Sequence, residues 1–313
     1  MQLVRGLHNL RPEHRGCVAT IGNFDGVHLG HLAVFRRLCL IGRKLGRPAT
    51  VVTFEPQPME YFVPEAAPAR LTRFREKVAA IRRAGVDRLL VLEFGPRLAA
   101  MSAEAFIGDL LVDRLGVEHL FVGDDFRFGQ GRRGDATLLR EAGLRHGFGV
   151  DSLDTIAHDN ARISSSRIRS ALDEGDFAAA AACLGRPYAI CGRVVHGDKR
   201  GRGIGFPTAN VDLHRRVSPV RGVFAVRVRG IDPAALPGVA NVGTRPTVDG
   251  GARDRLEVHL FDFARDVYGA HVEVEFVRRI REERRFPTFE ALRRQIERDA
   301  AEARGILGLG SCA

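Results

Sequence analysis

The chain has 313 residues, of which 45% are hydrophobic and 27% are charged, a composition that allows well-buried cores. Its length exceeds that of one small domain and favours two domains. The sequence contains no run of about 18 apolar residues, and its first residues lack the apolar segment of a signal peptide. We therefore expect neither a membrane span nor an export signal.

Positive charge dominates, because 48 Lys and Arg residues outnumber 38 Asp and Glu residues and give a net charge of +10. This balance suits nucleic acids, membrane surfaces or phosphorylated small molecules as partners. Five cysteines are scattered along the chain without metal-ligand spacing: Cys17, Cys39, Cys183, Cys191 and Cys312. Their odd number and their spacing favour a reducing cytoplasm over disulfides or a zinc site.

The first half of the chain alternates short apolar runs with helical patterns. Buried strands are predicted at residues 17–22, 49–54, 88–94 and 118–123. Helices are predicted at residues 30–46, 73–85, 102–116 and 135–147, and most of them end in glycine, a helix-stop signal. This alternation predicts an α/β domain, in which helices cover both faces of a parallel sheet. Sites in such sheets lie at the carboxyl ends of the strands.

In the second half of the chain, the spacing of the apolar residues changes. Residues 222–230, 255–263 and 271–279 alternate apolar with polar side chains, a pattern typical of half-buried antiparallel strands. Dense turn residues separate these runs, which predicts a small β-barrel or β-sandwich. A terminal helix is predicted at residues 287–307, with proline and threonine at its start. The change near residues 182–192 divides the chain into predicted domains 1–184 and 185–313.

The first candidate site is the segment "TIGNFDGVHLGHLAVF" (residues 20–35), which covers the end of the first predicted strand and the start of a helix. His28 and His31 are three residues apart and share one face if a helix begins here. A helix N-terminus suits a phosphate, while Gly26 and Gly30 let the backbone approach it closely. By themselves the two histidines also fit a structural role or a metal site, although no third ligand has suggestive spacing.

Two further segments extend this site. "ISSSRIRSAL" (residues 163–172) places three hydroxyl groups and two arginines at the start of a helical pattern. This segment suits a second phosphate-binding site, or simply a helix cap with surface arginines. "VGDDFRFGQGRRGD" (residues 122–135) combines acids, aromatic residues and glycines in a loop. That loop suits a ribose or an aromatic ring, or else an acidic turn beside core phenylalanines.

The second candidate site is "GDKRGRGIGFPTAN" (residues 197–210), which lacks the pattern of a Walker A loop. Its glycines and basic residues suit a loop that wraps phosphates. Thr208 and Asn210 offer two oxygen ligands on one face of an extended segment, and such hard ligands suit Mg²⁺. Glu257, on a predicted strand, can accept a proton from an attacking hydroxyl group. The structural alternatives are a glycine-rich hairpin with a basic rim and a solvated strand glutamate.

Taken together, these motifs resemble a known family. "GNFDGVHLGH", "TFEPQP", "GDDFRFGQGRRGD" and "ISSSRIR" are similar to the adenylyltransferase module of prokaryotic bifunctional riboflavin kinase/FMN adenylyltransferases (FAD synthetases), which belong to the HxGH nucleotidyltransferases. "GFPTANV", "LEVHLFDFARDVYG" and "RRIREERRFPTFEALRRQIERD" are similar to the riboflavin kinase module. The resemblance covers nearly the whole chain. It implies a Rossmann-like N-terminal domain followed by a six-stranded antiparallel β-barrel with a terminal helix.

The resemblance also implies two reactions and their residues. The C-terminal module would phosphorylate riboflavin with ATP to give FMN, and the N-terminal module would transfer AMP from ATP to FMN to give FAD and pyrophosphate. The kinase positions are Glu257 as catalytic base, Thr208 and Asn210 for Mg²⁺ and ATP, and Gly197, Lys199, Gly201 and Gly203 for ATP. The adenylyltransferase positions are His28 and His31 as catalytic residues, Asn23, Asp25, Ser164, Ser165 and Arg169 for ATP, and Asp124, Asp125 and Phe126 for nucleotide and flavin.

Two positions depart from the family pattern. Ser166 stands where threonine is usual and keeps the hydroxyl group, whereas Gln57 stands where histidine is common and has no assigned role. The expected partners are riboflavin, FMN and ATP in the cytoplasm, with neither nucleic acid nor membrane. The net charge motivates a nucleic-acid-binding protein as an alternative, but no stacking aromatic pattern accompanies it. The other alternative is an enzyme in which one of the two modules has lost its activity, although every polar group expected in both sites is present.

Overall fold

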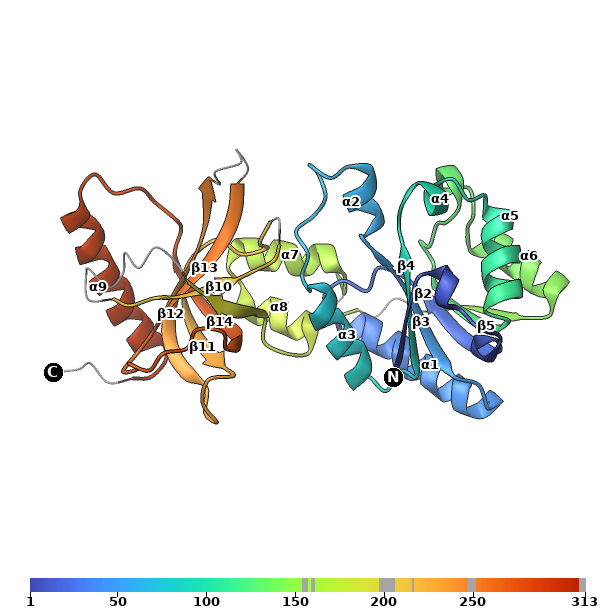
Figure 1. Ribbon diagram of the computed structural model, residues 1–313, viewed down its shortest axis with the longest axis horizontal. Helices are drawn as coiled ribbons and strands as arrows, with labels where there is room; N and C mark the ends of the chain where they lie inside the picture. The colour runs from blue at the N-terminus through green and yellow to red at the C-terminus, as the bar shows by residue number, and fades with distance from the viewer. Residues whose placement is uncertain (154–156, 159–160, 197–205, 216, 247–251, 310–313) are drawn as a thin grey trace. The chain divides into compact units, whose positions relative to one another are not determined.

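A computed structural model describes residues 1–153, 157–158, 161–196, 206–215, 217–246 and 252–309 (Figure 1). The contacts between residues divide the chain into two compact units. The first unit contains Met1–Pro68 and Phe74–Ser164, and the second contains Ala69–Arg73 and Ser165–Ala313. The boundary at residues 184/185 remains a prediction about functional modules, because the compact units divide at other residues.

The first unit contains a six-stranded sheet whose neighbouring strands are all parallel, in the order β1-β4-β3-β2-β5-β6. Its strands are β1 (Gln2–Arg5), β2 (Cys17–Ile21), β3 (Ala49–Glu55), β4 (Arg88–Glu93), β5 (Val117–Gly123) and β6 (Gly149–Leu153). A separate antiparallel pair joins β7 (Ala157–His158) to β8 (Ala161–Arg162). The parallel sheet predicted from the sequence is confirmed. The edge strands β1 and β6 are short additions to it.

Helices cover both faces of this sheet, because side chains along β2 alternate between two hydrophobic cores. Val18 packs with α1 and α3, whereas its neighbours Cys17 and Ala19 pack with α5, the adjoining π-helical segment and α6. The helices of this unit are α1 (Leu29–Leu45), α2 (Pro58–Phe62), α3 (Phe74–Arg83), α4 (Pro96–Ala99), α5 (Ala103–Ala105), the π-helical Phe106–Arg114, and α6 (Ala136–His146). Gly46 and Gly147 end α1 and α6 in the left-handed conformation, as their positions predicted.

The second unit contains a closed antiparallel barrel in the order β10-β13-β12-β11-β14-β9, which decides between the predicted barrel and sandwich (Figure 1). Its strands are β9 (Ala189–Val195), β10 (Ala209–Asp212), β11 (Gly222–Arg229), β12 (Leu236–Pro246), β13 (Ala252–Leu260) and β14 (His271–Arg281). Its helices are α7 (Ser165–Glu174), α8 (Phe177–Leu184) and α9 (Phe289–Ile306). Phe177 of α8 contacts Phe224 and Phe276 of the barrel, which explains why α7 and α8 group with this unit.

The short segment Ala69–Arg73 also belongs to the second unit, although it comes from the first half of the sequence. Its backbone carbonyl groups accept hydrogen bonds from three side chains of that unit: Arg169 to Ala69 (2.6 Å), Arg215 to Arg70 (3.0 Å) and Tyr188 to Leu71 (3.4 Å). Arg73 in turn donates to the carbonyl oxygen of Cys191 on β9 (3.1 Å). These long-range contacts have no signature in the local sequence pattern.

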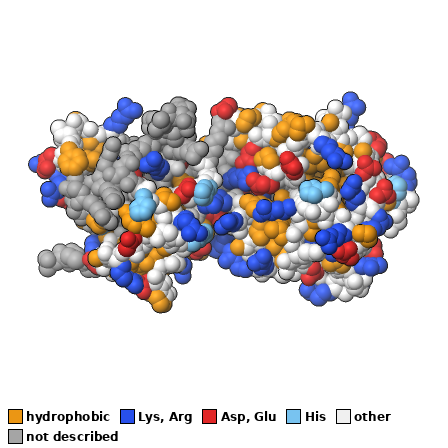
Figure 2. All heavy atoms as spheres, in the orientation of Figure 1, with side chains coloured by type: hydrophobic (Ala, Val, Ile, Leu, Met, Phe, Trp, Pro, Cys, Tyr) orange, Lys and Arg blue, Asp and Glu red, His pale blue; other side chains and the backbone are white. Residues whose placement is uncertain are grey.

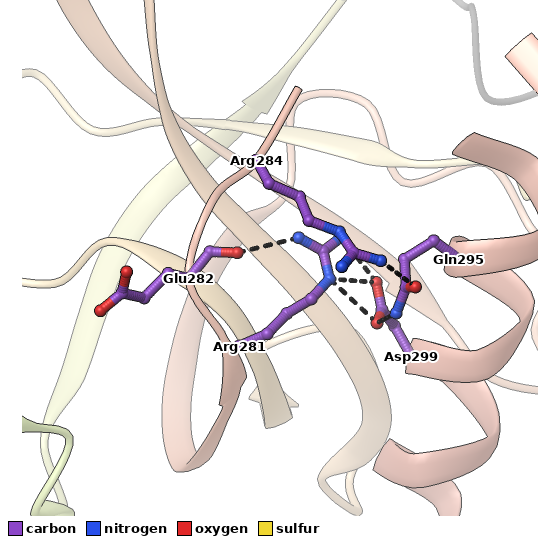
Figure 3. Close-up of polar contacts among 5 residues, drawn as sticks. All are labelled: Arg281, Glu282, Arg284, Gln295 and Asp299. Atoms are coloured by element: carbon purple, nitrogen blue, oxygen red, sulfur yellow. Dashed lines mark hydrogen bonds and ion pairs between the residues drawn. The ribbon is translucent and has the colours of Figure 1, made fainter. Parts of the chain in front are cut away.

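Helix α9 packs against β11, β12 and β14 and is tied to the end of β14 by a buried ion pair (Figure 3). Arg281 of β14 donates to both carboxylate oxygens of Asp299 on α9, at 3.0 Å from Nε and 2.8 Å from Nη2. Gln295, one turn earlier on α9, donates to Asp299 (2.7 Å) and accepts from Arg284. Asp299 is only 3% exposed, so its charge depends on these donors.

We expect Asp299→Ala to destabilise the second unit by up to roughly 3–5 kcal/mol, because it leaves the Arg281 guanidinium half-buried without its carboxylate. The chain has no tryptophan, so differential scanning calorimetry is the suitable measurement. Glu297→Ala, which breaks only the exposed pair with Arg293, is the matched control and should cost about 0.3–0.5 kcal/mol. Equal melting temperatures for the two variants would contradict this account of α9.

Candidate active sites

The first site lies at the carboxyl end of β2, where the strand order of the sheet reverses. The next strand in the chain, β3, lies on one side of β2, while β5 lies on the other. In open parallel sheets this switch point is where ligands bind. The loop with the two histidines follows β2, and Asp124, Asp125 and Phe126 follow β5. Pairing of β2 with β5 therefore brings two of the predicted site segments to one edge of the sheet.

The loop between β2 and α1 has a strained backbone. Phe24 has φ of 47°, Gly26 has φ of 81° and Val27 has φ of 43°. Positive φ is costly for residues with a Cβ, above all for a β-branched valine, at about 1–3 kcal/mol each. Such strain persists only where surrounding contacts hold it, and Phe24 and Val27 are both buried.

His28 caps the N-terminus of α1. Its Nδ1 accepts a hydrogen bond from the backbone N–H of His31 (3.3 Å), the role usually taken by serine or aspartate. Because Nδ1 accepts, the proton of the neutral ring lies on Nε2, which leaves that group as a donor. The rings of His28 and His31 stack with their centroids 3.6 Å apart, and Phe24 contacts His31 edge-on. The two imidazoles are thus fixed side by side at a helix start.

His31 is held in its neutral form. Burial lowers its pKa well below the ordinary histidine value of 6.5, and the nearby His28 and Lys77 lower the pKa further. The Nδ1 atom of His31 is buried and has no hydrogen-bond partner within the described part of the chain. A buried polar atom of this kind is unfavourable unless a ligand or water completes it. At neutral pH this pair therefore offers hydrogen bonds to an anion.

Gly30, between the two histidines, is required by the close approach of His28. A Cβ at this position would lie 3.1 Å from Cε1 and Nδ1 of the His28 ring. The same Cβ would lie 3.8 Å from the carbonyl oxygen of Ile163, so the segment leading to Ser164 lies beside the start of α1. The structure therefore brings Ser164 near the histidine pair within the first unit.

The remaining predicted residues of this site are placed as follows. Asn23 has an exposed side chain, whereas Asp25 is buried at 3% exposure. Asp124 accepts a hydrogen bond from Ser152, and Asp125 pairs with Arg162 (3.1 Å). Phe126 stacks on Phe128 and packs against one of the two sheet cores. Ser165 is the first residue of α7, and Arg169 lies one turn further along it. Both belong to the second unit, where Arg169 donates to the carbonyl group of Ala69.

The second site is a row of three side chains across neighbouring barrel strands. Glu257 of β13 lies directly opposite Asn210 of β10 on one side and Asn241 of β12 on the other. Residues paired in this way have Cβ atoms about 4.5–5.5 Å apart and point to the same face. All three side chains line a cavity of about 650 Å³, together with Thr208. The predicted base and both predicted metal ligands thus meet at one surface.

His259 holds the segment that carries Thr208. It lies two residues after Glu257 on the same face of β13, and its Nδ1 donates to the carbonyl oxygen of Pro207 (2.8 Å). Its ring also contacts Phe206 edge-on, with centroids 5.1 Å apart. These contacts fix the extended segment before β10 against β13.

Apolar side chains line much of the rest of the cavity, and charged side chains lie among them, including Arg281, Glu283 and Asp299. Phe206, Phe286, Phe289, Leu292 and Ile296 supply aromatic and aliphatic side chains, most of them from α9 and the loop before it. The cavity therefore combines the carboxylate of Glu257 and its neighbouring amide groups with aromatic side chains and with charged side chains. Its volume lies within the range typical of small-ligand pockets. This combination suits a ligand that carries both a planar ring and polar groups.

Sequence reasoning missed Asn241 and His259 as contributors to this site. The pairing of β12 with β13 brings Asn241 beside Glu257, and no local pattern reveals that pairing. The alternation that places His259 on the same side as Glu257 was visible in the sequence. The predicted phosphate loop residues Gly197, Lys199, Gly201 and Gly203 lie outside the described residues.

One chain thus contains a parallel-sheet unit with a histidine pair at its switch point and a closed barrel with a glutamate in its cavity, the combination that the sequence motifs led us to expect for a two-module transferase. The FAD synthetase family model matches residues 10–167, and the riboflavin kinase family model matches residues 184–307. The chain therefore belongs to the family of bifunctional riboflavin kinase/FMN adenylyltransferases.

Individual relatives agree with this assignment along the whole chain. The bifunctional riboflavin kinase/FMN adenylyltransferase of Escherichia coli K12 is 54% identical over 310 residues, which cover 99% of each chain. The Pseudomonas fluorescens enzyme of the same name is also 54% identical, with 98% of each chain covered. A solved structure from Streptococcus pneumoniae, named as a macrolide-efflux protein, matches with a TM-score of 0.80 and 30% identity over 97% of this chain and 99% of that one. No helix among the described residues is long and apolar enough to cross a membrane.

We expect Gly30→Ala to lower FAD formation from FMN by about tenfold, because the added methyl group displaces the His28 ring by a few tenths of an ångström. Riboflavin phosphorylation by the same protein should be unchanged. Gly108→Ala is the matched control, because a Cβ there meets no atom within 4 Å. A Gly30→Ala enzyme with the wild-type rate of FAD formation would refute the tight fit around His28.

Proposed function

We propose that the barrel cavity binds riboflavin and ATP, and that Glu257 is the catalytic base of the kinase reaction. The observation that carries this proposal is the position of Glu257 between Asn210 and Asn241 on the wall of that cavity. Glu257 accepts the proton of the terminal ribityl hydroxyl group, whose oxygen bonds to the γ-phosphorus. The bond between that phosphorus and the bridging oxygen of the β-phosphate breaks, and ADP leaves with FMN as the other product.

Thr208 and Asn210 are proposed to hold Mg²⁺ together with ATP. Their hydroxyl and amide oxygens fit a hard cation, and both side chains line the cavity next to the Glu257 carboxylate. When bound, Mg²⁺ neutralises phosphate charge. The loop residues Gly197, Lys199, Gly201 and Gly203 complete the proposed ATP site by sequence resemblance. The aromatic wall with Phe286 and Phe289 suits the isoalloxazine ring.

In the first unit, the proposed reaction joins FMN to the α-phosphate of ATP. An oxygen of the FMN phosphate bonds to the α-phosphorus, the bond to the bridging oxygen of the β-phosphate breaks, and pyrophosphate leaves. His28 donates from Nε2, and neutral His31 donates beside it, to the negative charge that develops at the α-phosphate. No covalent intermediate with the protein is needed, because the nucleophile comes from FMN.

Further residues have proposed binding roles. Asn23 and Asp25 in the loop after β2 and Ser164, Ser165 and Arg169 at the start of α7 are assigned to ATP. Asp124, Asp125 and Phe126 after β5 are assigned to the nucleotide and flavin. Support for the loops after β2 and β5 comes from their common position at the switch point of the sheet.

We propose cytoplasmic small-molecule partners for the whole chain. The four cysteines in the described residues are free thiols, which supports a reducing compartment. On the face drawn in Figure 2, Lys and Arg side chains are interspersed with Asp and Glu side chains.

Replacing the proposed kinase base tests the second site. Glu257→Ala should lower FMN formation from riboflavin by at least about 100-fold, because general-base catalysis contributes at least that much. FAD formation from added FMN should remain near the wild-type rate. Glu302→Ala, at an exposed position of α9, should change neither rate. Loss of both activities in folded Glu257→Ala protein would contradict the assignment of two sites.

Replacing a histidine tests the first site, and here FAD formation rather than FMN formation should be lost. His31→Ala should lower FAD formation from FMN by about 100–1,000-fold, because it removes a donor at the developing charge. FMN formation from riboflavin should be unaffected. His146→Ala, at the exposed end of α6, is the control. Both activities are measured by chromatographic separation of the flavins, and intact FAD formation in His31→Ala would refute the proposed role.

A further inference from the structure

Lys77 of α3 is a cationic residue in the core of the first unit that none of the proposed steps uses. Its side chain is completely buried, with 0% exposure. Lysine is almost never fully buried unless specific partners compensate the lost hydration of its charge. Its Nζ donates to the backbone carbonyl oxygen of Asn23 at 2.7 Å. The buried ammonium group thus ends at the loop that carries the histidine pair.

Two donors from different elements meet at that carbonyl group. Thr53 of β3, also fully buried, donates to the oxygen of Asn23 from Oγ1 at 3.3 Å. Asn23 directly precedes Phe24, the first of the residues with positive φ in this loop. A strained loop keeps its conformation only where its surroundings fix it. Lys77 and Thr53 fix it at its first strained turn, from the helix side and from the sheet side.

The charge of Lys77 also acts on the catalytic pair. Lys77 is one of three causes of the lowered pKa of His31, after burial and the neighbouring His28. A positive charge close to an imidazole disfavours a second positive charge on that ring. Lys77 therefore helps to keep His31 neutral while it anchors the loop that precedes it.

Lysine is rare in this chain, in which most cationic residues are arginines. Of 48 cationic residues in the chain, only Lys44, Lys77 and Lys199 are lysines. Arginine presents a planar fork of five donors, whereas lysine presents a compact charge on a thin stem. The short contact between Nζ and the Asn23 carbonyl oxygen suits a compact charge.

We infer that Lys77 is a positioning residue for adenylyl transfer, whose buried ammonium group fixes the Asn23 carbonyl and thereby the strained loop that orients His28 and His31. This inference rests on the proposed function of the first unit. Lys77 acts through the histidines and does not itself contact the reacting phosphates. The riboflavin kinase reaction of the second unit should be independent of it.

The test compares three variants of the full-length chain with the wild type. Lys77→Met removes the charge and the donor at similar length, Thr53→Val removes only the second donor, and Lys44→Met changes an exposed lysine of α1. We expect Lys77→Met to lower kcat for FAD formation by at least tenfold, with a smaller effect for Thr53→Val and none for Lys44→Met. FMN formation from riboflavin should stay unchanged in all three variants, which reports on the folding of the second unit.

A titration separates positioning from a merely structural role. Nuclear magnetic resonance of the His31 ring should give a higher pKa in Lys77→Met than in the wild type, because a nearby positive charge has been removed. The pKa should be unchanged in Thr53→Val. Because His31 then takes up its proton at a higher pH, the rate of FAD formation should begin to fall at a higher pH in Lys77→Met than in the wild type as the solution is made more acidic. Lys77→Arg retains the positive charge, so its rate of FAD formation should fall at the same acidic pH as that of the wild type.

A rate of FAD formation within twofold of wild type in Lys77→Met, together with an unchanged His31 pKa, would overturn the inference. If Lys77→Met does not give a folded first unit, Thr53→Val decides, and wild-type kinetics in that variant would also overturn it. The proposed function fails in a different way, because the wild type would then form no FAD from FMN. The His31 titration still reports on Lys77 in that case, since it needs no activity.

Discussion

Strand pairing determines both sites, because each site is assembled from residues that are far apart in the sequence. In the first unit, parallel pairing of β2 with β3 and β5 sets three loops at the carboxyl edge of the sheet. In the second unit, antiparallel pairing of β13 with β10 and β12 places Glu257 between two asparagines. Side chains on a paired strand have little freedom of direction, so the polar groups are oriented before any ligand binds.

The two sites differ in the backbone conformation that holds their side chains. In the barrel, Asn210, Asn241 and Glu257 lie on paired strands, where the hydrogen-bond ladder supplies rigidity. The histidine pair lies after a turn in which Phe24 and Val27 have positive φ, and that conformation needs external support. His28 contributes by capping α1, and the stacked imidazoles require that at least one ring stays neutral. Rigidity at the first site therefore comes from side chains and from burial.

Much of this fold could be predicted from local patterns. The four central strands of the parallel sheet, the glycine-terminated helices, three barrel strands and the terminal helix all follow from the period of their apolar residues. The edge strands β1 and β6 are four and five residues long and gave no clear signal. The insertion of Ala69–Arg73 into the second unit depends on Arg169, Arg215 and Tyr188, which lie some 100 or more residues away. Contacts of that range have no local signature.

The sites were predictable to a similar extent. The resemblance of the motifs to a known family pointed to His28, His31, Thr208, Asn210 and Glu257, and the last three line one cavity. Asn241 could not be predicted, because its role comes only from the register between β12 and β13. Lys77 could not be assigned either, since its buried contact with Asn23 joins a helix to a distant loop. Its rarity as a lysine was the one visible sign.

The central claim is that one chain carries two successive flavin reactions at separate sites. The most direct measurement follows the flavins by chromatography while the purified protein is incubated with riboflavin, ATP and Mg²⁺. Our account predicts that FMN appears first and that FAD accumulates afterwards at its expense. Folded protein that forms neither product from riboflavin, and no FAD from added FMN, would contradict the account.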